Sequence, residues 1–135
     1  MTDGLLDTNV LIHWSRLDTT DLPDRAAIST ITIAELSAGV HAAKSTLDRA
    51  NRLDLLQRAE SDFDPIPFDL AAARAYGRIA AAVVGIGRSP RGRVADQMIA
   101  AIATARDLPL YTTNPTDYAG LDRILDIIAI ARPDT

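Results

Sequence analysis

The sequence predicts an α/β domain whose central sheet is mainly parallel. Short apolar segments alternate along the chain with longer segments in which apolar residues recur every three or four positions, the spacing of a helix. Alternating strands and helices favour parallel pairing, because each connecting helix packs on a face of the sheet. The chain has 135 residues, enough to enclose one core, so we expect a single domain over residues 1–135.

The first half of the chain predicts two strands, each followed by a helix, and then a third helix. The strands are Gly4–Leu6 and Ala27–Thr30, and the helices are Val10 to about Arg16, Thr32 to about Ala43, and Thr46–Glu60. Acidic and basic residues stand four positions apart along the third helix, a spacing that stabilises a solvated helix face. We therefore expect one face of that helix to be exposed.

The second half begins with a brief extended segment, Pro65–Phe68, and a long helix capped by Asp69. The apolar residues of this helix form a stripe that steps by three and four positions, namely Ala72, Tyr76, Ile79, Val83 and Ile86. Gly85–Arg93 is rich in glycine and arginine and contains a proline, which predicts a flexible basic loop.

A further helix begins at Val94 and is apolar on nearly every side from Met98 to Ala105. A helix of that kind should be central and buried. Strands are expected at Leu108–Thr112 and Asp126–Ala131, with a turn at Thr113–Tyr118 between them. These elements complete the expected sheet.

Composition excludes several classes of function. The net charge of -4 and the pI near 5.0 count against a protein that coats nucleic acid, because such binding depends on many Lys and Arg contacts to phosphate. The sequence has no cysteine, which excludes disulfides, thiolate catalysis and a cysteine-ligated zinc site. It also lacks an export signal and a membrane-spanning segment, so we expect a cytoplasmic protein without membrane contact.

Acidic side chains follow the expected strands at the edge where parallel sheets bind ligands. Asp7 follows the first strand, Glu35 lies just beyond the second, and Asp117 follows the strand at Leu108–Thr112. Ligands of such sheets gather outside the carboxyl ends of the strands. Asp96 is a fourth candidate, because it lies in the first turn of the buried helix that leads into that last strand.

Each of these acids also has an ordinary structural interpretation. Asp7 and Asp96 could be helix caps, Glu35 could complete a capping box with Thr32, and Asp117 could form a turn. All four, however, would converge on one edge of one sheet. Two carboxylates about 5 Å apart repel by roughly 3 kcal/mol at an effective dielectric constant of 20, so four would require cations. Oxygen ligands of this kind favour Mg²⁺ or Mn²⁺.

Four segments that contain these acids resemble the motifs of the PIN-domain family. They are Leu5–Ile12, Ile31–Gly39, Ala95–Ala101 and Thr112–Tyr118. The segments occur in the order and spacing of the family and extend over nearly the whole chain. The resemblance implies a three-layer α/β/α PIN-like fold, an acidic metal site and endonucleolytic cleavage of RNA.

The resemblance also implies a role for particular residues. Asp7, Glu35, Asp96 and Asp117 would be the catalytic acids and would hold Mg²⁺, or Mn²⁺ in its place, directly or through water. Thr8 and Thr112 match small hydroxyl residues that support the site. Asn114 stands where some members place another acid, which leaves open whether it contacts the metal.

Short PIN domains of this length resemble toxins of VapBC toxin–antitoxin systems, which a VapB antitoxin silences. The implied partners are therefore an RNA substrate, a VapB-like antitoxin and a second copy in a homodimer. A PIN-like nuclease that processes RNA outside such a system remains an alternative. In either case Arg88, Arg91 and Arg93 of the basic loop could guide an RNA backbone toward the metals, or could simply be solvated.

The mechanism expected of a PIN-like nuclease is hydrolysis by a metal-activated water, which leaves a 5′-phosphate and a 3′-hydroxyl. A metal-free ribonuclease would instead need a base and an acid, usually histidines. The sequence has only His13 and His41, both on expected helices, and we expect them to have packing or surface roles.

Two other functions compete with the nuclease. A phosphatase of the haloacid dehalogenase kind also begins with an apolar strand and an aspartate, but its chemistry needs a second aspartate where this chain has Asn9. A non-catalytic interaction domain could keep the fold and lose the site. The intact set of acids argues against that alternative.

Overall fold

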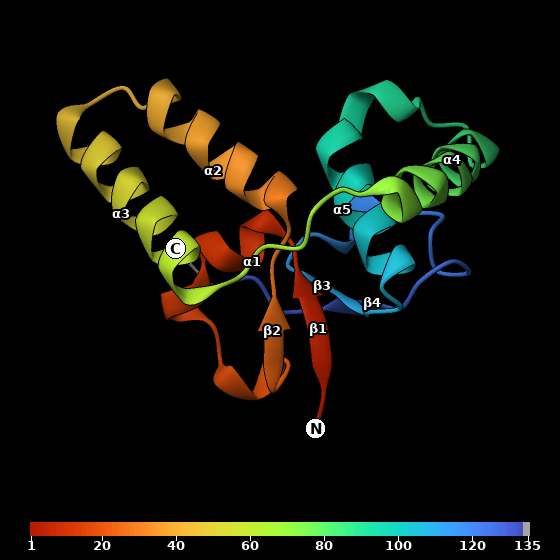
Figure 1. Cartoon of the computed structure of the whole chain (residues 1–135), viewed down its shortest axis with the longest axis horizontal. Coiled ribbons are helices and arrows are strands. Elements are labelled where there is room, and N and C mark those ends of the chain that lie inside the picture. Colours follow the sequence, from red (N-terminus) through yellow and green to blue (C-terminus); the bar gives the residue numbers. More distant parts are fainter. Residues whose placement is uncertain (134–135) are drawn as a thin grey trace.

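A computed structural model describes residues 1–133 and contains the strands and helices expected of an α/β protein (Figure 1). The strands are β1 (Asp3–Leu6), β2 (Arg25–Ala27), β3 (Leu110–Thr112) and β4 (Ile127–Ala129). The helices are α1 (Thr8–Ile12), α2 (Thr30–Ala42), α3 (Thr46–Asp62), α4 (Leu70–Gly85) and α5 (Val94–Ala105). Short 3-10 helices occur at Trp14–Arg16, Thr19–Asp21, Pro90–Arg93 and Pro115–Tyr118.

The four strands form one sheet in the order β2-β1-β3-β4, and every pair is parallel. Leu5 of β1 lies opposite Ala27 of β2 on one side and Leu110 of β3 on the other. β1 is therefore a central strand. The predicted parallel sheet is confirmed.

Successive residues of the central strands point to opposite faces of the sheet and build two cores. Leu5 and Leu110 pack in the cluster that contains α4 and α5. Their neighbours Leu6 and Tyr111 pack in the second cluster, with residues of α1, α2 and α3. This alternation follows from the two-residue repeat of a strand. It gives the predicted three-layer α/β/α arrangement, in which one sheet lies between two sets of helices.

Helix α5 is buried as predicted, and Ile99–Ala103 are at most 1% exposed. The predicted stripe of α4 is also largely correct, since Ala72, Ile79 and Val83 are buried. Ile86 is an error, because α4 ends at Gly85 and the side chain of Ile86 is 47% exposed. The cap at Asp69 is present, with its carboxylate accepting from the amide of Ala72 at 3.0 Å.

Several element boundaries differ from the sequence prediction. The first helix begins at Thr8 rather than Val10, because Asp7 caps it. The second strand ends at Ala27, because Ser29 becomes the cap of α2 and accepts from the amide of Thr32. The predicted basic loop ends in a 3-10 helix, Pro90–Arg93.

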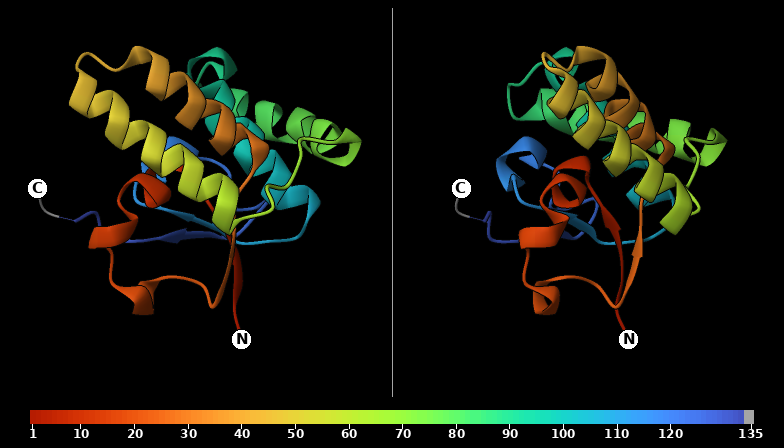
Figure 2. Two further views of the ribbon diagram at one scale, coloured as in Figure 1. Left: turned by 60° about the vertical axis from the view of Figure 1, so that its left-hand side comes forward. Right: turned by 90° about the vertical axis from the view of Figure 1, so that its left-hand side faces the viewer.

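The helices form two arms above the carboxyl ends of the strands. Helices α2 and α3 lie side by side in one arm, and α4 and α5 lie in the other, as Figures 1 and 2 show. The N-terminus lies at the opposite end of β1 in all three views. Within residues 1–133, no helix is long and apolar enough to span a membrane. The single domain over residues 1–135 stays a prediction.

The close approach of β1 to β3 requires glycine at position 4. A Cβ atom built there would overlap the ring carbons Cδ1 and Cε1 of Tyr111 and would lie 3.2 Å from Pro23. Both neighbours are buried, so neither can move freely. We predict that Gly4→Ala lowers the free energy of unfolding by about 1–3 kcal/mol, as measured by denaturant unfolding.

The matched control is Gly77→Ala in the exposed middle of α4, where an added Cβ would meet nothing within 4 Å. Because alanine favours a helix over glycine, this variant should be more stable by about 0.5–1 kcal/mol. A Gly4→Ala protein as stable as the parent would contradict the packing described for β1.

Candidate metal centre and active site

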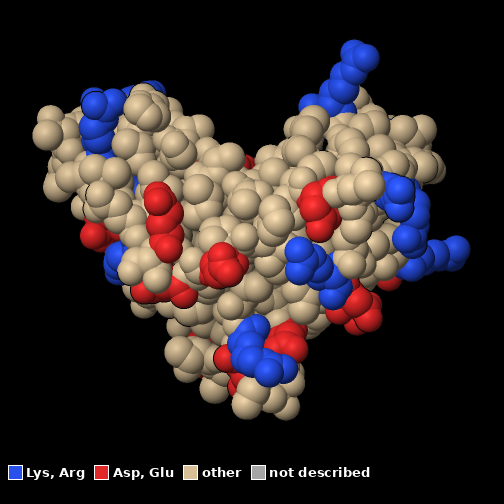
Figure 3. All heavy atoms as spheres, in the orientation of Figure 1, with Lys and Arg blue, Asp and Glu red and all other residues tan. Residues whose placement is uncertain are grey.

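The predicted acids lie where the carboxyl ends of β1 and β3 meet the bases of the two arms. Figure 3 shows the molecule hollowed between the arms, with acidic atoms at the floor of the hollow. A cleft of about 640 Å³ is lined by Thr8, Glu35 and Asp96 together with residues of α3. A second hollow, of about 520 Å³, lies between the basic loop and Asp117. Glu35 and Asp96 therefore line one depression and Asp117 lines the other, while Asp7 is buried.

Asp7 joins three parts of the chain through one buried carboxylate, whose residue is 2% exposed. One oxygen, Oδ1, accepts from the amide of Val10 at 3.0 Å and caps α1. The other oxygen, Oδ2, accepts from the hydroxyl of Thr112 at 2.5 Å and from that of Tyr118 at 3.3 Å. Burial raises the pKa of Asp7, and the hydrogen bonds from Thr112 and Val10 act in the opposite direction. Asp7 is thus the cap of α1, as one interpretation predicted, and its role in a metal site stays a prediction.

Glu35 contacts the site and does not belong to a capping box. Helix α2 begins after Ser29, which places Glu35 in the second turn of the helix. The hydroxyl of Thr8 donates to Oε1 of Glu35 at 2.6 Å and lies 3.0 Å from the hydroxyl of Thr32. The proposed pairing of Thr32 with Glu35 as a capping box is therefore wrong, because Ser29 is the residue that occupies the cap position.

Asp96 is half-buried in the first turn of α5 and does not cap it. The cap position belongs to Arg93, and no side chain makes a capping hydrogen bond there. The cap interpretation of Asp96 is therefore wrong. Burial, together with the smaller contributions of the charges of Asp117, Glu35 and Asp7, raises the pKa of Asp96 to about 6, and Arg93 acts in the opposite direction. The other three acids are thus close enough to act electrostatically on Asp96.

Asp117 lies in the 3-10 helix after β3, and its carboxylate is paired with an arginine. Arg93 Nη1 lies 2.8 Å from Asp117 Oδ1 and 3.8 Å from Asp96 Oδ2. The amide of Asp117 donates to the carbonyl of Asn114, so its backbone also forms the predicted turn. One guanidinium thus lies against two of the four acids.

The four carboxylates fit a hard divalent cation as ligands, although they must move closer together to bind the same ion. Within residues 1–133, no group of three acidic or histidine side chains is already close enough to hold one ion. The acids nevertheless supply only oxygen ligands, are at least partly buried and repel one another. These are the properties of a Mg²⁺ or Mn²⁺ site. Closer approach of the carboxylates would require the charge of a cation.

The predicted supporting residues lie around these acids. Thr112 donates to Asp7 and accepts from the amide of Asn114 at 2.9 Å, so Asn114 orients the threonine through its backbone. Tyr118, by contrast, is a contact of Asp7 that the sequence does not single out. Burial raises its pKa well above the usual tyrosine value, which keeps the hydroxyl protonated and able to donate. Its only signal in the sequence is its position next to Asp117.

The basic loop is attached to the segment that carries Asp117. Arg88 Nη1 donates to the carbonyl of Thr116 at 2.9 Å, and Arg93 pairs with Asp117. The side chain of Arg91 has no such contact within the described residues and is exposed. The three arginines therefore differ in their surroundings, which the sequence does not reveal.

The two histidines lie away from the acids. His13 is buried at the end of α1, where Nδ1 lies 3.0 Å from the guanidinium of Arg16. Burial and that guanidinium lower the pKa of His13. His41 is exposed in the last turn of α2. Neither lines the cleft with Glu35 and Asp96, as expected from their packing and surface roles.

Comparison with known proteins gives one consistent result. The family model described as the PIN domain matches residues 4–124. Ribonuclease VapC5 of Mycobacterium tuberculosis is 41% identical over 122 residues, which are 88% of this chain and 87% of that protein. The tRNA(fMet)-specific endonuclease VapC of Shigella flexneri is 33% identical over 125 residues, with 87% and 91% covered.

A solved structure shows the same fold. The crystal structure of VapBC-5, a member of the VapBC family of toxin-antitoxin systems from Mycobacterium tuberculosis, superposes with a TM-score of 0.85 at 39% identity. The superposition covers 96% of this chain and 100% of that one. The chain therefore belongs to the PIN-domain family, within which it is a ribonuclease toxin of the VapC type. This assignment replaces the phosphatase and non-catalytic alternatives.

The charge of Asp96 should destabilise the metal-free protein. A carboxyl whose pKa is raised in the folded state ionises less readily there than in the unfolded chain, so its ionisation at neutral pH costs stability. We predict that Asp96→Asn, which keeps the shape and removes the charge, raises the free energy of unfolding in EDTA by about 1–3 kcal/mol. The measurement is denaturant unfolding at pH 7.

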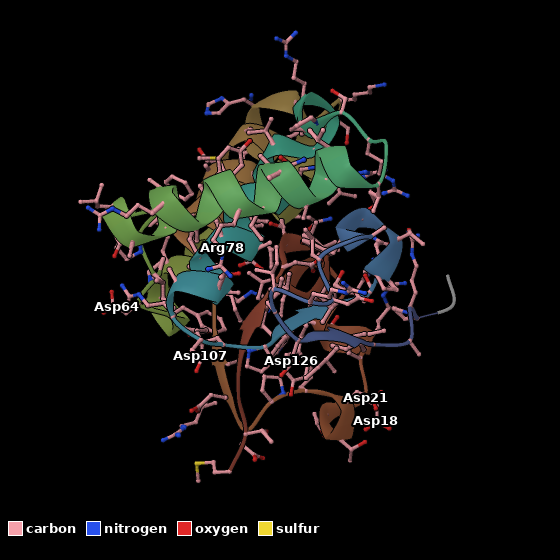
Figure 4. All side chains as sticks on the ribbon, turned by 90° about the vertical axis from the view of Figure 1, so that its right-hand side faces the viewer. Asp18, Asp21, Asp64, Arg78, Asp107 and Asp126 are labelled. Atoms are coloured by element: carbon pink, nitrogen blue, oxygen red, sulfur yellow. The ribbon has the colours of Figure 1, made fainter. Side chains whose placement is uncertain are left out.

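The matched control is Asp64→Asn. Asp64 is exposed, and in Figure 4 it lies on the opposite side of the molecule from the basic loop. The free energy of unfolding of the Asp64→Asn protein should differ from that of the parent by less than about 0.5 kcal/mol. A destabilised Asp96→Asn protein would show that Asp96 is held by favourable contacts and not by opposing charges.

Proposed function

We propose that this ribonuclease hydrolyses RNA with the help of Mg²⁺, or Mn²⁺ in its place, held by Asp7, Glu35, Asp96 and Asp117 directly or through water. The observation that supports this most strongly is the convergence of four carboxylates at one edge of the sheet, where burial and the charges of the other three raise the pKa of Asp96 to about 6. When bound, the metal would activate a water, stabilise charge on the phosphate and leave 5′-phosphate and 3′-hydroxyl ends.

The surrounding hydroxyl groups orient the acids in this proposal. Thr112 and Tyr118 fix one oxygen of Asp7, while the amide of Val10 holds the other. Thr8 fixes Glu35 from the neighbouring helix. Donors of this kind set the direction in which a carboxylate presents its free electron pairs, and their loss weakens metal sites. Asn114 contributes through its backbone contact with Thr112, and no metal contact is required of it.

The proposed partners are an RNA substrate, a VapB-like antitoxin and a second copy of this chain. The similar structure from Mycobacterium tuberculosis is described as VapBC-5, and this supports an antitoxin partner here. The RNA substrate is supported by the similar ribonucleases. The homodimer and the cytoplasmic location remain predictions from the sequence.

Metal dependence can be tested with the purified protein and a defined RNA. We predict cleavage in Mg²⁺ or Mn²⁺, no cleavage in EDTA, and 5′-phosphate ends on sequencing of the products. Asp7→Asn can still cap α1 and should lower the cleavage rate more than about 100-fold, since losing an outer contact of a metal site already costs about 10- to 100-fold.

Thermal melts of Asp7→Asn establish that the variant folds before its rate is compared. Thr113→Ser provides a matched control, because Thr113 is adjacent to Thr112 but its hydroxyl has no partner within the described residues. Undiminished cleavage in EDTA would contradict the proposed mechanism.

Arg91 is the arginine of the basic loop that is best suited to test RNA binding, because its side chain is exposed and its removal breaks no described contact. We predict that Arg91→Ala weakens RNA binding about two- to fivefold and reduces the salt dependence of binding by nearly one phosphate contact. Arg78→Ala, an exposed arginine in the middle of α4 (Figure 4), should change neither. If Arg91→Ala and Arg78→Ala changed RNA binding equally, the basic loop would be a solvated loop with no role of its own in RNA binding.

A further inference from the structure

Arg93 lies among the acids of the proposed metal site. Its Nη1 is 2.8 Å from Asp117 and 3.8 Å from Asp96, at the point where the basic loop enters α5. The Arg93 side chain is 51% exposed, whereas those of Asp96 and Asp117 are 23% and 17% exposed. The guanidinium therefore covers these carboxylates from the solvent side.

The position of this charge has a consequence for metal binding. The carboxylates repel one another, and Arg93 is the cation within the described residues that pairs with two of them. A divalent ion on the same oxygens would lie within a few ångströms of the guanidinium, where like charges repel. Both cations cannot therefore keep their most favourable positions at the same time.

We propose that Arg93 is an internal counter-ion that competes with the divalent metal for Asp117 and Asp96. It stabilises the acids while no metal is bound, and metal binding displaces its guanidinium toward the solvent. The long side chain reaches the acids from the loop and is half-exposed, so it can leave them without unfolding the first turn of α5. This inference rests on the proposed metal-dependent function and makes Arg93 a positioning residue.

A purely structural role for Arg93 is the main alternative. Arg88, from the same loop, donates to the carbonyl of Thr116 and so attaches the loop to the same segment without touching an acid. Losing Arg88 should loosen this attachment, whereas losing Arg93 should also remove a competing charge. The affinity for metal separates the two effects.

The experiment uses the full chain stripped with EDTA and titrated with MnCl₂, with binding followed by calorimetry and by thermal melts. Arg93→Gln should have a lower melting temperature than the parent in EDTA and should bind Mn²⁺ about three- to tenfold more tightly, the range expected for a partly exposed ion pair. Arg93→Lys, a point charge without the planar fork, should bind Mn²⁺ with intermediate affinity. Arg88→Gln should bind Mn²⁺ as the parent does.

Each other outcome overturns the inference. If Arg93→Gln bound Mn²⁺ no more tightly than the parent, Arg93 would not compete with the metal. The proposed function would still hold if Asp7→Asn were impaired in both Mn²⁺ binding and RNA cleavage. If Arg88→Gln gained as much affinity for Mn²⁺ as Arg93→Gln, the gain would come from loosening of the basic loop and not from removal of a competing charge. If the parent bound no Mn²⁺ and cleaved RNA equally in EDTA, both the proposed function and the competition would fail. Should Arg93→Gln not fold, Arg93→Lys carries the same comparison.

Discussion

The carboxylate of Asp7 is the contact on which the rest of the site depends. It ends the central strand, begins α1 and binds the hydroxyls of Thr112 and Tyr118, so it connects the first strand to the third and to the turn that carries Asp117. A buried carboxylate is tolerated only when its oxygens have partners. The partners of Asp7 come from both halves of the chain, so the same hydrogen bonds that satisfy it also hold the turn with Asp117 close to it.

Much of the fold follows from the sequence because its signals are local. Three features depend on residues close together in the chain. They are the alternation of strands and helices, the cap at Asp69, and the apolar character of α5 on nearly every side. The error at Ser29 has a physical reason. Serine suits both an extended segment and a helix cap, and only its hydrogen bond to Thr32 shows which of these applies.

The site was predictable in part, for the same reason. The positions of Asp7, Asp96 and Asp117 at strand and helix ends, and of Glu35 early in α2, could be recognised from order and spacing. The contacts of Tyr118 and Arg93 could not, because each depends on how the turn after β3 packs against residues far away in the sequence. Residues that share a site through tertiary packing leave no periodic pattern in the chain.

The central position of β1 also determines when the enzyme can form during synthesis. Asp7 and Thr112 are 105 positions apart, and β1 pairs with β3, which is synthesised much later. Such a distant pairing must await the synthesis of all the residues between the two strands. A nascent chain that stops before β3 would hold Asp7 without its third-strand partner. The ribosome that makes this nuclease is therefore exposed to no assembled active site until β3 and the turn that carries Asp117 have left its exit tunnel.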